Sequence, residues 1–179
     1  MFILYAIPVG ILGGALLGGR LDRLADLRFD WAWLAIVGLL VQVVLFSTPV
    51  AGLVGDAGPA IYVASTAAVL IAVLRNWRIP GMALVAVGAG SNLLAIVANG
   101  GVMPASPEAV ASLGQEASAG FSNSAVMTDP ALRPLTDIFA LPAWLPGANV
   151  FSIGDVLLGV GVATVIALGM RRHGARSSD

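Results

Sequence analysis

Residues 81–98 read GMALVAVGAGSNLLAIVA, a run of apolar and small residues without a charged side chain. A helix needs roughly 20 mostly apolar residues to cross the hydrocarbon core of a membrane, so this run predicts a membrane-spanning helix. Four further stretches have the same character: residues 2–19, 31–48, 60–74 and 152–170. The sequence therefore predicts an all-α integral membrane bundle of about five transmembrane helices.

The composition of the whole chain agrees with a membrane protein. Hydrophobic residues make up 58% of the 179 residues, charged residues 11%, and the mean hydropathy is +0.93. Soluble domains carry about 25% charged residues, so these few charges would not cover a compact soluble surface. The net charge of −1 does not favour binding to nucleic acid. Cysteine is absent and the single histidine, His173, lies in a charged tail, so we expect neither a metal centre nor another cofactor.

The arginines predict the orientation of the bundle. Arg20, Arg23 and Arg28 lie between the first two stretches, Arg75 and Arg78 between the third and fourth, and Arg171, Arg172 and Arg176 after the last. With five spans these three segments fall on one side, and only Arg133 falls on the other. Cytoplasmic loops are rich in Lys and Arg, which predicts an external N-terminus and a cytoplasmic tail, residues 171–179. We expect one membrane domain over residues 1–179, in the cytoplasmic membrane of a bacterium.

One face of the first expected helix is formed by small residues. Gly10, Gly14 and Gly18 recur every four residues, and such a face lets helix backbones approach closely in lipid. We expect it to pack within the chain. The alternative is contact with a partner membrane protein or self-association, and membrane lipid is a further expected partner.

The external segment, residues 99–151, is much longer than a usual connection, and such segments are commonly functional or disordered. One short helix is expected after Pro107, while the remainder of residues 108–129 is small, polar and expected to be mobile. Residues 130–149 are apolar and rich in proline, which predicts a partly ordered cap on the outer membrane surface.

Six residues around this cap form the predicted binding site: Asn92, Asn99, Asp137, Trp144, Ser152 and Asp155. An ionisable residue within a span indicates function, so Asp155 is a candidate catalytic residue. Asp137, in the cap, is the second candidate. Each polar residue has a structural alternative. Ser152 and Asp155 have the spacing of a capping box, Asn92 suits an interhelical hydrogen bond, Asn99 suits a helix end, and Asp137 suits a helix cap.

Three motifs resemble those of an uncharacterised bacterial family of small multi-pass membrane proteins. They are NGGVMP at 99–104, DIFALP at 137–142 and NVFSIGDVLL at 149–158. GGR at 18–20 and RFDW at 28–31 fit as well, so the likeness covers essentially the whole chain. The family is a domain of unknown function, so the resemblance implies a multi-pass fold and no activity.

Shorter motifs resemble the lipoprotein signal peptidase, an intramembrane aspartyl protease. Asp137-Ile-Phe139 and Phe151-Ser-Ile-Gly-Asp155 are similar to two of its motifs in order and orientation. A third motif of the peptidase reads Gly-Asn-x-x-Asp-Arg. The matching stretch of this chain begins with Ser91-Asn92, and it has Ala95 and Ile96 in place of the aspartate and the arginine. Aspartyl proteolysis needs two carboxylates that share a proton, so Asp137 would have to replace the missing one.

Three classes of function remain. A non-catalytic accessory or binding protein with a polar site at the outer membrane face is the main prediction. The first alternative is a membrane-embedded enzyme that acts on a lipid or lipid-linked substrate through a degenerate aspartyl-peptidase-like site. The second is a small oligomeric transporter, although transport by a monomer would need polar residues through the full membrane depth.

Overall fold

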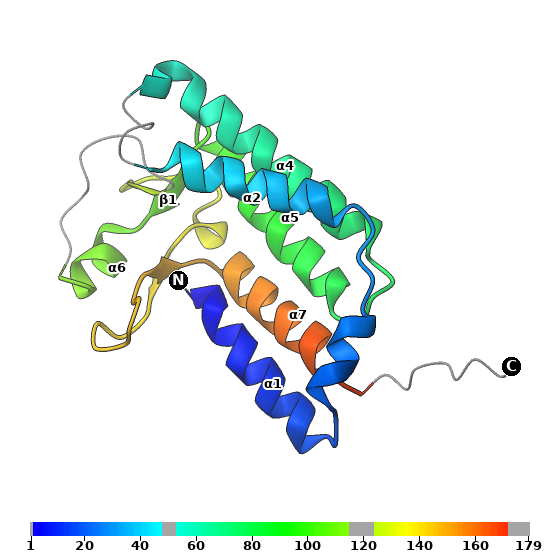
Figure 1. Ribbon diagram of the computed structural model, residues 1–179. Coiled ribbons are helices and arrows are strands. Elements are labelled where there is room, and N and C mark those ends of the chain that lie inside the picture. Colours follow the sequence, from blue (N-terminus) through cyan, green and yellow to red (C-terminus); the bar gives the residue numbers. More distant parts are fainter. Residues whose placement is uncertain (1, 48–52, 115–123, 172–179) are drawn as a thin grey trace, which may run out of the picture.

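The computed structural model describes residues 2–47, 53–114 and 124–171, and most of these residues are helical (Figure 1). The long helices are α1 (Ala6–Leu16), α2 (Ala32–Leu45), α4 (Gly58–Arg75), α5 (Met82–Ala98) and α7 (Ile153–Gly169). Short 3-10 helices accompany them: η1 (Phe2–Tyr5), η2 (Leu21–Asp26), η3 (Gly55–Ala57) and η4 (Arg133–Leu135). The prediction of a mostly helical protein is confirmed.

The long helices coincide with the apolar stretches of the sequence, but they differ in length. Residues Gly55–Arg75 form a helix of 21 residues with a mean hydropathy of 2.0, long and apolar enough to cross a membrane. The other four apolar helices, Phe2–Leu16, Ala32–Leu45, Met82–Ala98 and Ile153–Gly169, have at most 17 residues. By length and composition alone, one helix of the described chain therefore passes as a membrane span.

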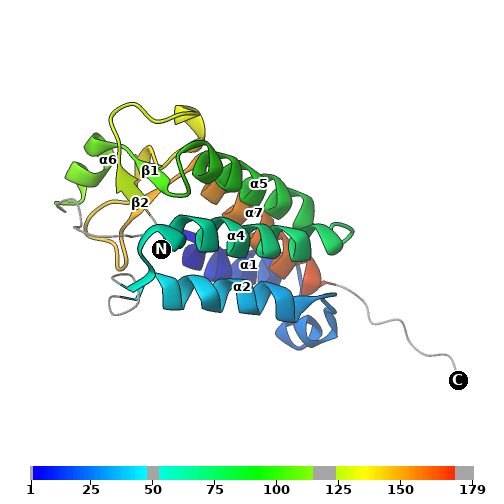
Figure 2. The ribbon, with the colours of Figure 1, turned by 90° about the horizontal axis from the view of Figure 1, so that it is seen from above.

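The long helices form a curved row whose order differs from that of the sequence. α1 packs against α7, α7 against α5, α5 against α4, and α4 against α2. Figure 1 shows α2 and α4 on one side of the row and α1 and α7 on the other, and in the view from above α4 lies over α1 (Figure 2). The ends of the row, α1 and α2, follow each other in the chain, but they are not among the pairs that pack closely. The row is therefore open between α1 and α2.

The predicted small-residue face of α1 packs against α7. A Cβ on Gly10 would lie 2.9 Å from the backbone oxygen of Ala163, and one on Gly14 would lie 3.2 Å from the Cα of Ala167. Gly18 takes no part, because it follows the end of α1 with a φ of 73° and has open space around it. Packing within the chain thus uses Gly10 and Gly14, and self-association or a partner protein on this face stays a prediction.

The described part of the segment from 99 to 151 contains short strands, one short α-helix and the 3-10 helix η4. β1 (Met103–Ala105) pairs in parallel with β2 (Ser124–Val126), and β3 (Phe139–Ala140) pairs antiparallel with β4 (Val150–Phe151). α6 (Pro107–Ser112) begins at Pro107, as predicted. The strands were not predicted, because two or three residues are too few to show an alternating pattern. Residues 115–123 of the stretch expected to be mobile, and 172–179 of the tail, lie outside the described residues.

Most of the charged residues lie at the ends of the helices that are farthest from the strands. Asn76, after α4, accepts a hydrogen bond from the backbone N–H of Asp30 at 2.9 Å and donates to its carbonyl at 2.7 Å. The backbone N–H of Arg20 donates to the carbonyl of Met170 at 2.9 Å. η2 and the ends of α4 and α7 therefore meet opposite the strands (Figure 1). We call the side of the protein where these helix ends meet the arginine end, and the opposite side, with the strands, the strand end.

Candidate functional site

A hydrogen-bond network joins α5 to α7 at the strand end. Asn92 Nδ2 donates to Asp155 Oδ1 at 2.8 Å, and Ser152 Oγ donates to Asn92 Oδ1 at 2.8 Å. Ser152 and Asp155 also form a capping box, in which each backbone N–H donates to the side chain of the other residue. The two structural alternatives for Asn92 and Asp155 are therefore both present. Asp155 is at once a helix cap and part of an interhelical network.

Two glycines allow this network to form. Gly154 lies directly against the side chain of Asn92, and a Cβ at this position would overlap Asn92 Oδ1. A Cβ on Gly88 would lie 2.5 Å from the backbone oxygen of Gly154 and 2.8 Å from the backbone nitrogen of Leu158. Because neither position has a side chain, α5 and α7 approach closely enough for Asn92 to reach the start of α7.

Asp137 lies on an extended segment beside β1, where its backbone is held on both sides. Its N–H donates to the carbonyl of Pro104 at 2.9 Å, and its carbonyl accepts from the N–H of Ser106 at 3.0 Å. The residue follows η4 and forms a bridge with Ala105, so it is not the helix cap that the sequence allowed. These bonds fix the direction in which its side chain enters the interior.

The side chain of Asp137 is only 5% exposed and incompletely hydrogen-bonded. Its Oδ2 accepts a long hydrogen bond from the hydroxyl of Ser124, at 3.3 Å. Its Oδ1 is buried and has no hydrogen-bond partner among the residues that the structure describes. A buried polar atom without a partner costs free energy, so this oxygen marks a place where a bound group would be stabilised.

Burial raises the pKa of Asp137 from 3.8 to about 7, and the charge of Asp155 contributes to the rise. The hydrogen bond from Ser124 opposes it, because it stabilises the ionised form. The two candidate aspartates therefore interact electrostatically, although they are far apart in sequence and lie on different elements. Near neutral pH, Asp137 is divided between its protonated and ionised forms.

Two residues of this site, Tyr62 and Ser124, were not predicted from the sequence. Tyr62 on α4 is 8% exposed, packs edge-on against Phe46 and lies close enough to both aspartates for their charges to act on its hydroxyl. A tyrosine inside an apolar stretch was the only available signal. Ser124 lies in a small, polar stretch where nothing distinguishes it from its neighbours, and only the pairing of β2 with β1 brings it to Asp137.

The remaining two predicted residues lie outside this group. Asn99 donates from Nδ2 to the carbonyls of Ala95 and Ala131, at 2.8 and 2.9 Å, and accepts from the N–H of Ala131 at 2.8 Å. It therefore ties the segment after Pro130 to the end of α5. Trp144 is 80% exposed on the loop between β3 and β4.

The sequence was compared with known protein families, curated proteins and solved structures. Residues 26–167 match the Family of unknown function (DUF5317). The chain belongs to this family. No curated protein and no solved structure matches it. The likeness to an uncharacterised family, indicated by three sequence motifs, is thereby confirmed, and membership in DUF5317 assigns no activity.

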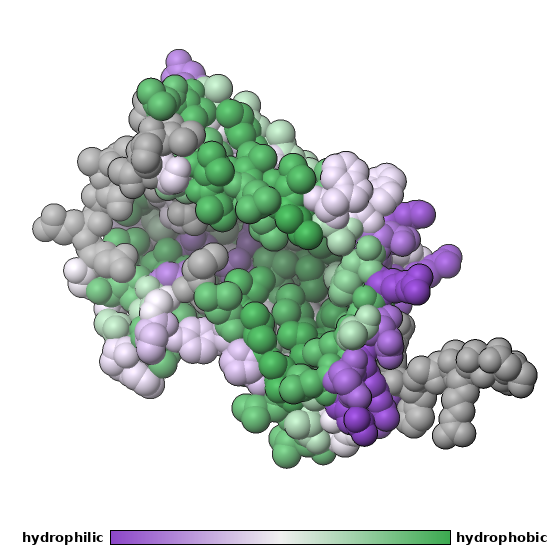
Figure 3. Space-filling model, viewed as in Figure 1, coloured by the Kyte–Doolittle hydropathy of each residue, from purple (hydrophilic) through white to green (hydrophobic). Residues whose placement is uncertain are grey.

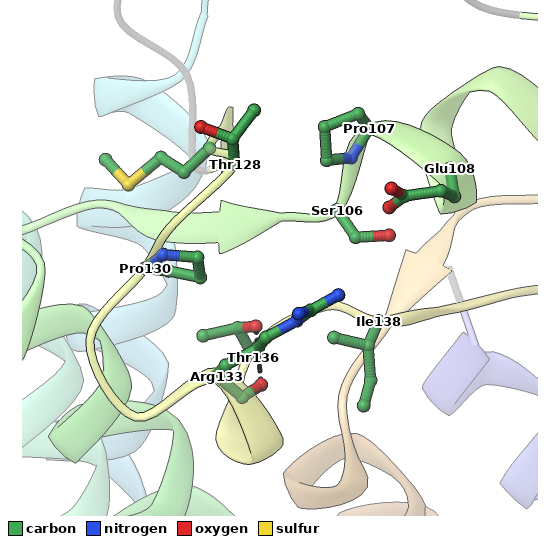
Figure 4. A pocket seen from close by; sticks show the side chains of 9 residues that line it. Ser106, Pro107, Glu108, Thr128, Pro130, Arg133, Thr136 and Ile138 are labelled. Atoms are coloured by element: carbon green, nitrogen blue, oxygen red, sulfur yellow. Dashed lines mark hydrogen bonds between the residues drawn. The ribbon is translucent and has the colours of Figure 1, made fainter.

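The DUF5317 chain also has a small, partly open pocket of about 50 Å³ beside α6 (Figure 4). Thr136 and Ile138 line it, and since side chains alternate along an extended segment, Asp137 between them points the other way. Glu108 and Arg133 both reach toward the pocket, so it presents one charge of each sign (Figure 4). Among the described residues of this DUF5317 chain, no cluster of three or more side chains suits a metal ion.

Proposed function

We propose that this protein crosses the cytoplasmic membrane five times and binds the polar group of a ligand at its strand end, which faces outward. The observation that carries the binding site is Oδ1 of Asp137, which is buried and has no hydrogen-bond partner among the described residues. The charge of Asp155 acts on the same carboxyl group. The protein is an accessory or binding protein in this proposal, and Asp137 supplies the acceptor for a hydrogen-bond donor of the ligand.

Exposed apolar side chains on every long helix support the membrane part of the proposal. Five examples, one from each helix, are at least half exposed: Leu12, Val43, Ile71, Val87 and Val160. The space-filling view shows broad apolar surfaces along the helices and hydrophilic residues gathered at the arginine end (Figure 3). Lipid would cover such surfaces, and the four shorter helices lack only a turn or two of the length expected of a span.

The distribution of arginine supports the orientation. All arginines that the structure describes, except Arg133, lie at the arginine end. They are found in and around η2, at and after the end of α4, and after α7. The positive-inside rule would place this end in the cytoplasm and the strand end outside. The predicted site would then open toward the outer leaflet.

Labelling of introduced cysteines tests this topology, and the natural chain supplies no cysteine of its own. Asp26 on η2 and Ala111 on α6 are both exposed. In intact cells, a membrane-impermeant maleimide should label Ala111→Cys, whereas it should label Asp26→Cys only after permeabilisation. Equal labelling of both variants in intact cells would contradict the five-span topology.

The geometry favours binding over hydrolysis. Both carboxylate oxygens of Asp155 already accept hydrogen bonds, from Asn92 and from the backbone of Ser152, and these bonds hold the start of α7. An aspartyl protease needs both carboxyl groups directed at one water molecule. Of the two aspartates, only Asp137 has a carboxyl oxygen without a hydrogen-bond partner among the described residues, which suits recognition of a donor.

Hydrolysis by the two aspartates is the second candidate, because the charge of Asp155 acts on Asp137. Incubation of the purified protein with a lipoprotein precursor distinguishes the two functions. The binding proposal predicts no cleavage. Cleavage that disappears in both Asp137→Asn and Asp155→Asn would overturn it in favour of an aspartyl peptidase.

Chemical modification tests whether the site is open to a ligand. Dicyclohexylcarbodiimide is a hydrophobic reagent that reacts with protonated carboxyl groups. Because burial raises the pKa of Asp137 to about 7, the reagent should modify this residue at pH 6, and the reaction should fade as the pH rises above 7. Peptide mass spectrometry would locate the modification.

Two variants control this experiment. Asp137→Asn should abolish the modification, whereas Asp129→Asn, which removes an exposed carboxylate of the same segment, should leave it unchanged. If the folded protein is not modified at Asp137 at pH 6, the carboxyl group is sealed from the surroundings, and the proposed binding site does not exist.

A further inference from the structure

The concave side of the open row of helices is hollowed (Figure 3). Figure 3 shows this hollow between a ridge formed by α2 and α4 and a second ridge formed by α1 and α7, with apolar walls and hydrophilic residues in its depth. It lies on the concave side of the row, where α1 and α2 do not pack closely against each other. In a membrane, such a hollow would open sideways to lipid.

The contacts of α7 show which of its residues face this hollow. One face of α7 meets α5, through Gly154 and Gly161, and another meets α1, through Gly159 and Ala163. Residues seven apart in a helix lie nearly above one another. A stripe of Asp155, Val162 and Gly169 runs along the concave side between these two faces. Val160 lies on the opposite side of α7 and is 51% exposed.

The stripe runs from the strand end to the arginine end, and the structure shows what lies at each. At the arginine end, a Cβ on Gly169 would lie 2.7 and 3.0 Å from the side chains of Leu27 and Leu24, so the segment between α1 and α2 closes the hollow. At the strand end the stripe begins with Asp155, whose charge acts on the carboxyl group of the buried Asp137. From Asp155 to Gly169 the helix rises about 21 Å, which exceeds the roughly 15 Å of one lipid leaflet.

We propose that this hollow holds one hydrocarbon chain of a phospholipid whose primary ammonium head group binds at Asp155 and Asp137. The inference rests on the proposed membrane topology and site, and it names the ligand. Charge complementarity selects the head group, because two acidic side chains, Asp155 and Asp137, lie at the strand end, and Asp137 is ionised in part near neutral pH. The arginines lie at the other end, apart from Arg133, which lines the pocket on the opposite side of the Asp137 segment.

The unpartnered oxygen distinguishes among amines. A primary ammonium carries three N–H donors, and one of them would complete the hydrogen bonding of Asp137 Oδ1. The quaternary ammonium of choline has the same charge but no N–H, so it would leave this oxygen without a partner. Phosphatidylethanolamine and phosphatidylcholine with identical acyl chains therefore form a matched pair of ligands.

Native mass spectrometry of the intact protein in detergent, titrated with each lipid, measures this preference. A charge-assisted hydrogen bond corresponds to at least about a 10-fold difference in affinity, so phosphatidylethanolamine should bind about 10-fold more tightly or better. Asp137→Asn should remove most of the difference, because an amide does not provide a charged acceptor. Equal binding of the two lipids to the natural protein would overturn the assignment of the head group.

Two matched substitutions on α7 test the place of the hydrocarbon chain. Val162→Trp fills the concave side and should weaken binding of both lipids at least about 10-fold, whereas Val160→Trp adds the same bulk on the exposed side and should not. Val162→Leu should weaken binding less, which gives a second, milder variant if Val162→Trp does not fold. Equal effects of Val162→Trp and Val160→Trp would overturn the hollow as the lipid site.

The failure of this inference can be separated from failure of the proposed function. If carbodiimide modifies Asp137 but the two lipids bind equally, the site is open and takes a ligand other than an amine lipid. If carbodiimide does not modify Asp137, the proposed site and this inference fail together.

Discussion

Raising the pH from about 4 to 7 is expected to cost the folded protein about 4 kcal/mol of stability through Asp137 alone. The ordinary pKa of this carboxyl is 3.8, and burial together with the charge of Asp155 raises it to about 7 in the folded chain. Between these values the unfolded chain loses the proton while the folded chain keeps it. The contribution of Asp137 to stability is therefore largest below pH 4 and falls as the pH rises to 7. Above pH 7 this contribution no longer changes.

Thermal unfolding of the natural protein and of Asp137→Asn, followed by circular dichroism between pH 4 and 8, measures this effect. The natural protein should lose thermal stability steeply over the interval, and the variant should lose much less. Asp129→Asn is the control, because it removes an exposed carboxylate and should follow the natural protein. Parallel curves for the natural protein and Asp137→Asn would show that Asp137 is not buried as described.

Gly88→Ala is expected to destabilise the protein by about 3 kcal/mol, a large effect for a single added methyl group. The new Cβ would lie 2.5 Å from the backbone oxygen of Gly154 and 2.8 Å from the backbone nitrogen of Leu158. Both are backbone atoms of α7, so no side-chain rotation relieves the overlap. The two helices would have to move apart, and the hydrogen bonds of Asn92 would lengthen.

Gly90→Ala is the matched control, because it adds the same methyl group to the same helix where no atom lies within 4 Å. Alanine favours helix over glycine by up to about 1 kcal/mol, so this variant should be as stable as the natural protein or slightly more stable. Thermal unfolding in detergent compares the two. If both variants unfold at the same temperature, α5 and α7 are not packed through their glycines.

Gly88→Ala should also disturb the candidate site. Asn92 lies one turn further along α5, and its carboxamide bridges Ser152 and Asp155 across the contact that Gly88 and Gly154 make possible. The interface between the helices and the position of Asp155 therefore depend on the same close approach.

Local patterns in the sequence were sufficient to predict the helices. Apolar runs indicated all five, the spacing of Ser152 and Asp155 indicated the capping box, and Pro107 indicated the start of α6. Each of these features depends on residues within a few positions of one another. For the same reason the sequence indicated Asn92, Asp137 and Asp155 as a candidate group, since each is an unusual polar residue in an apolar surrounding.

The sequence did not predict what surrounds Asp137. Its burial depends on the pairing of its segment with β1 and on Ser124 from β2, and its electrostatic environment on Asp155 and Tyr62. Two- and three-residue strands leave no periodic pattern, and small polar residues around Ser124 look alike. The pKa of Asp137 and its unpartnered oxygen follow from these long-range contacts alone.

The sequence by itself determined where the helices lie in the chain and which of their residues are polar, because periodicity and capping are local properties. Only the tertiary structure decided the order of the helices in space, in which the last helix, α7, lies between α1 and α5. That order depends on which backbones come closest, through Gly88 with Gly154 and Gly10 with Ala163. Many small residues occur on every helix, and the sequence does not show which of them meet. These contacts also leave α1 and α2 apart, which opens the hollow on the concave side of the row (Figure 3).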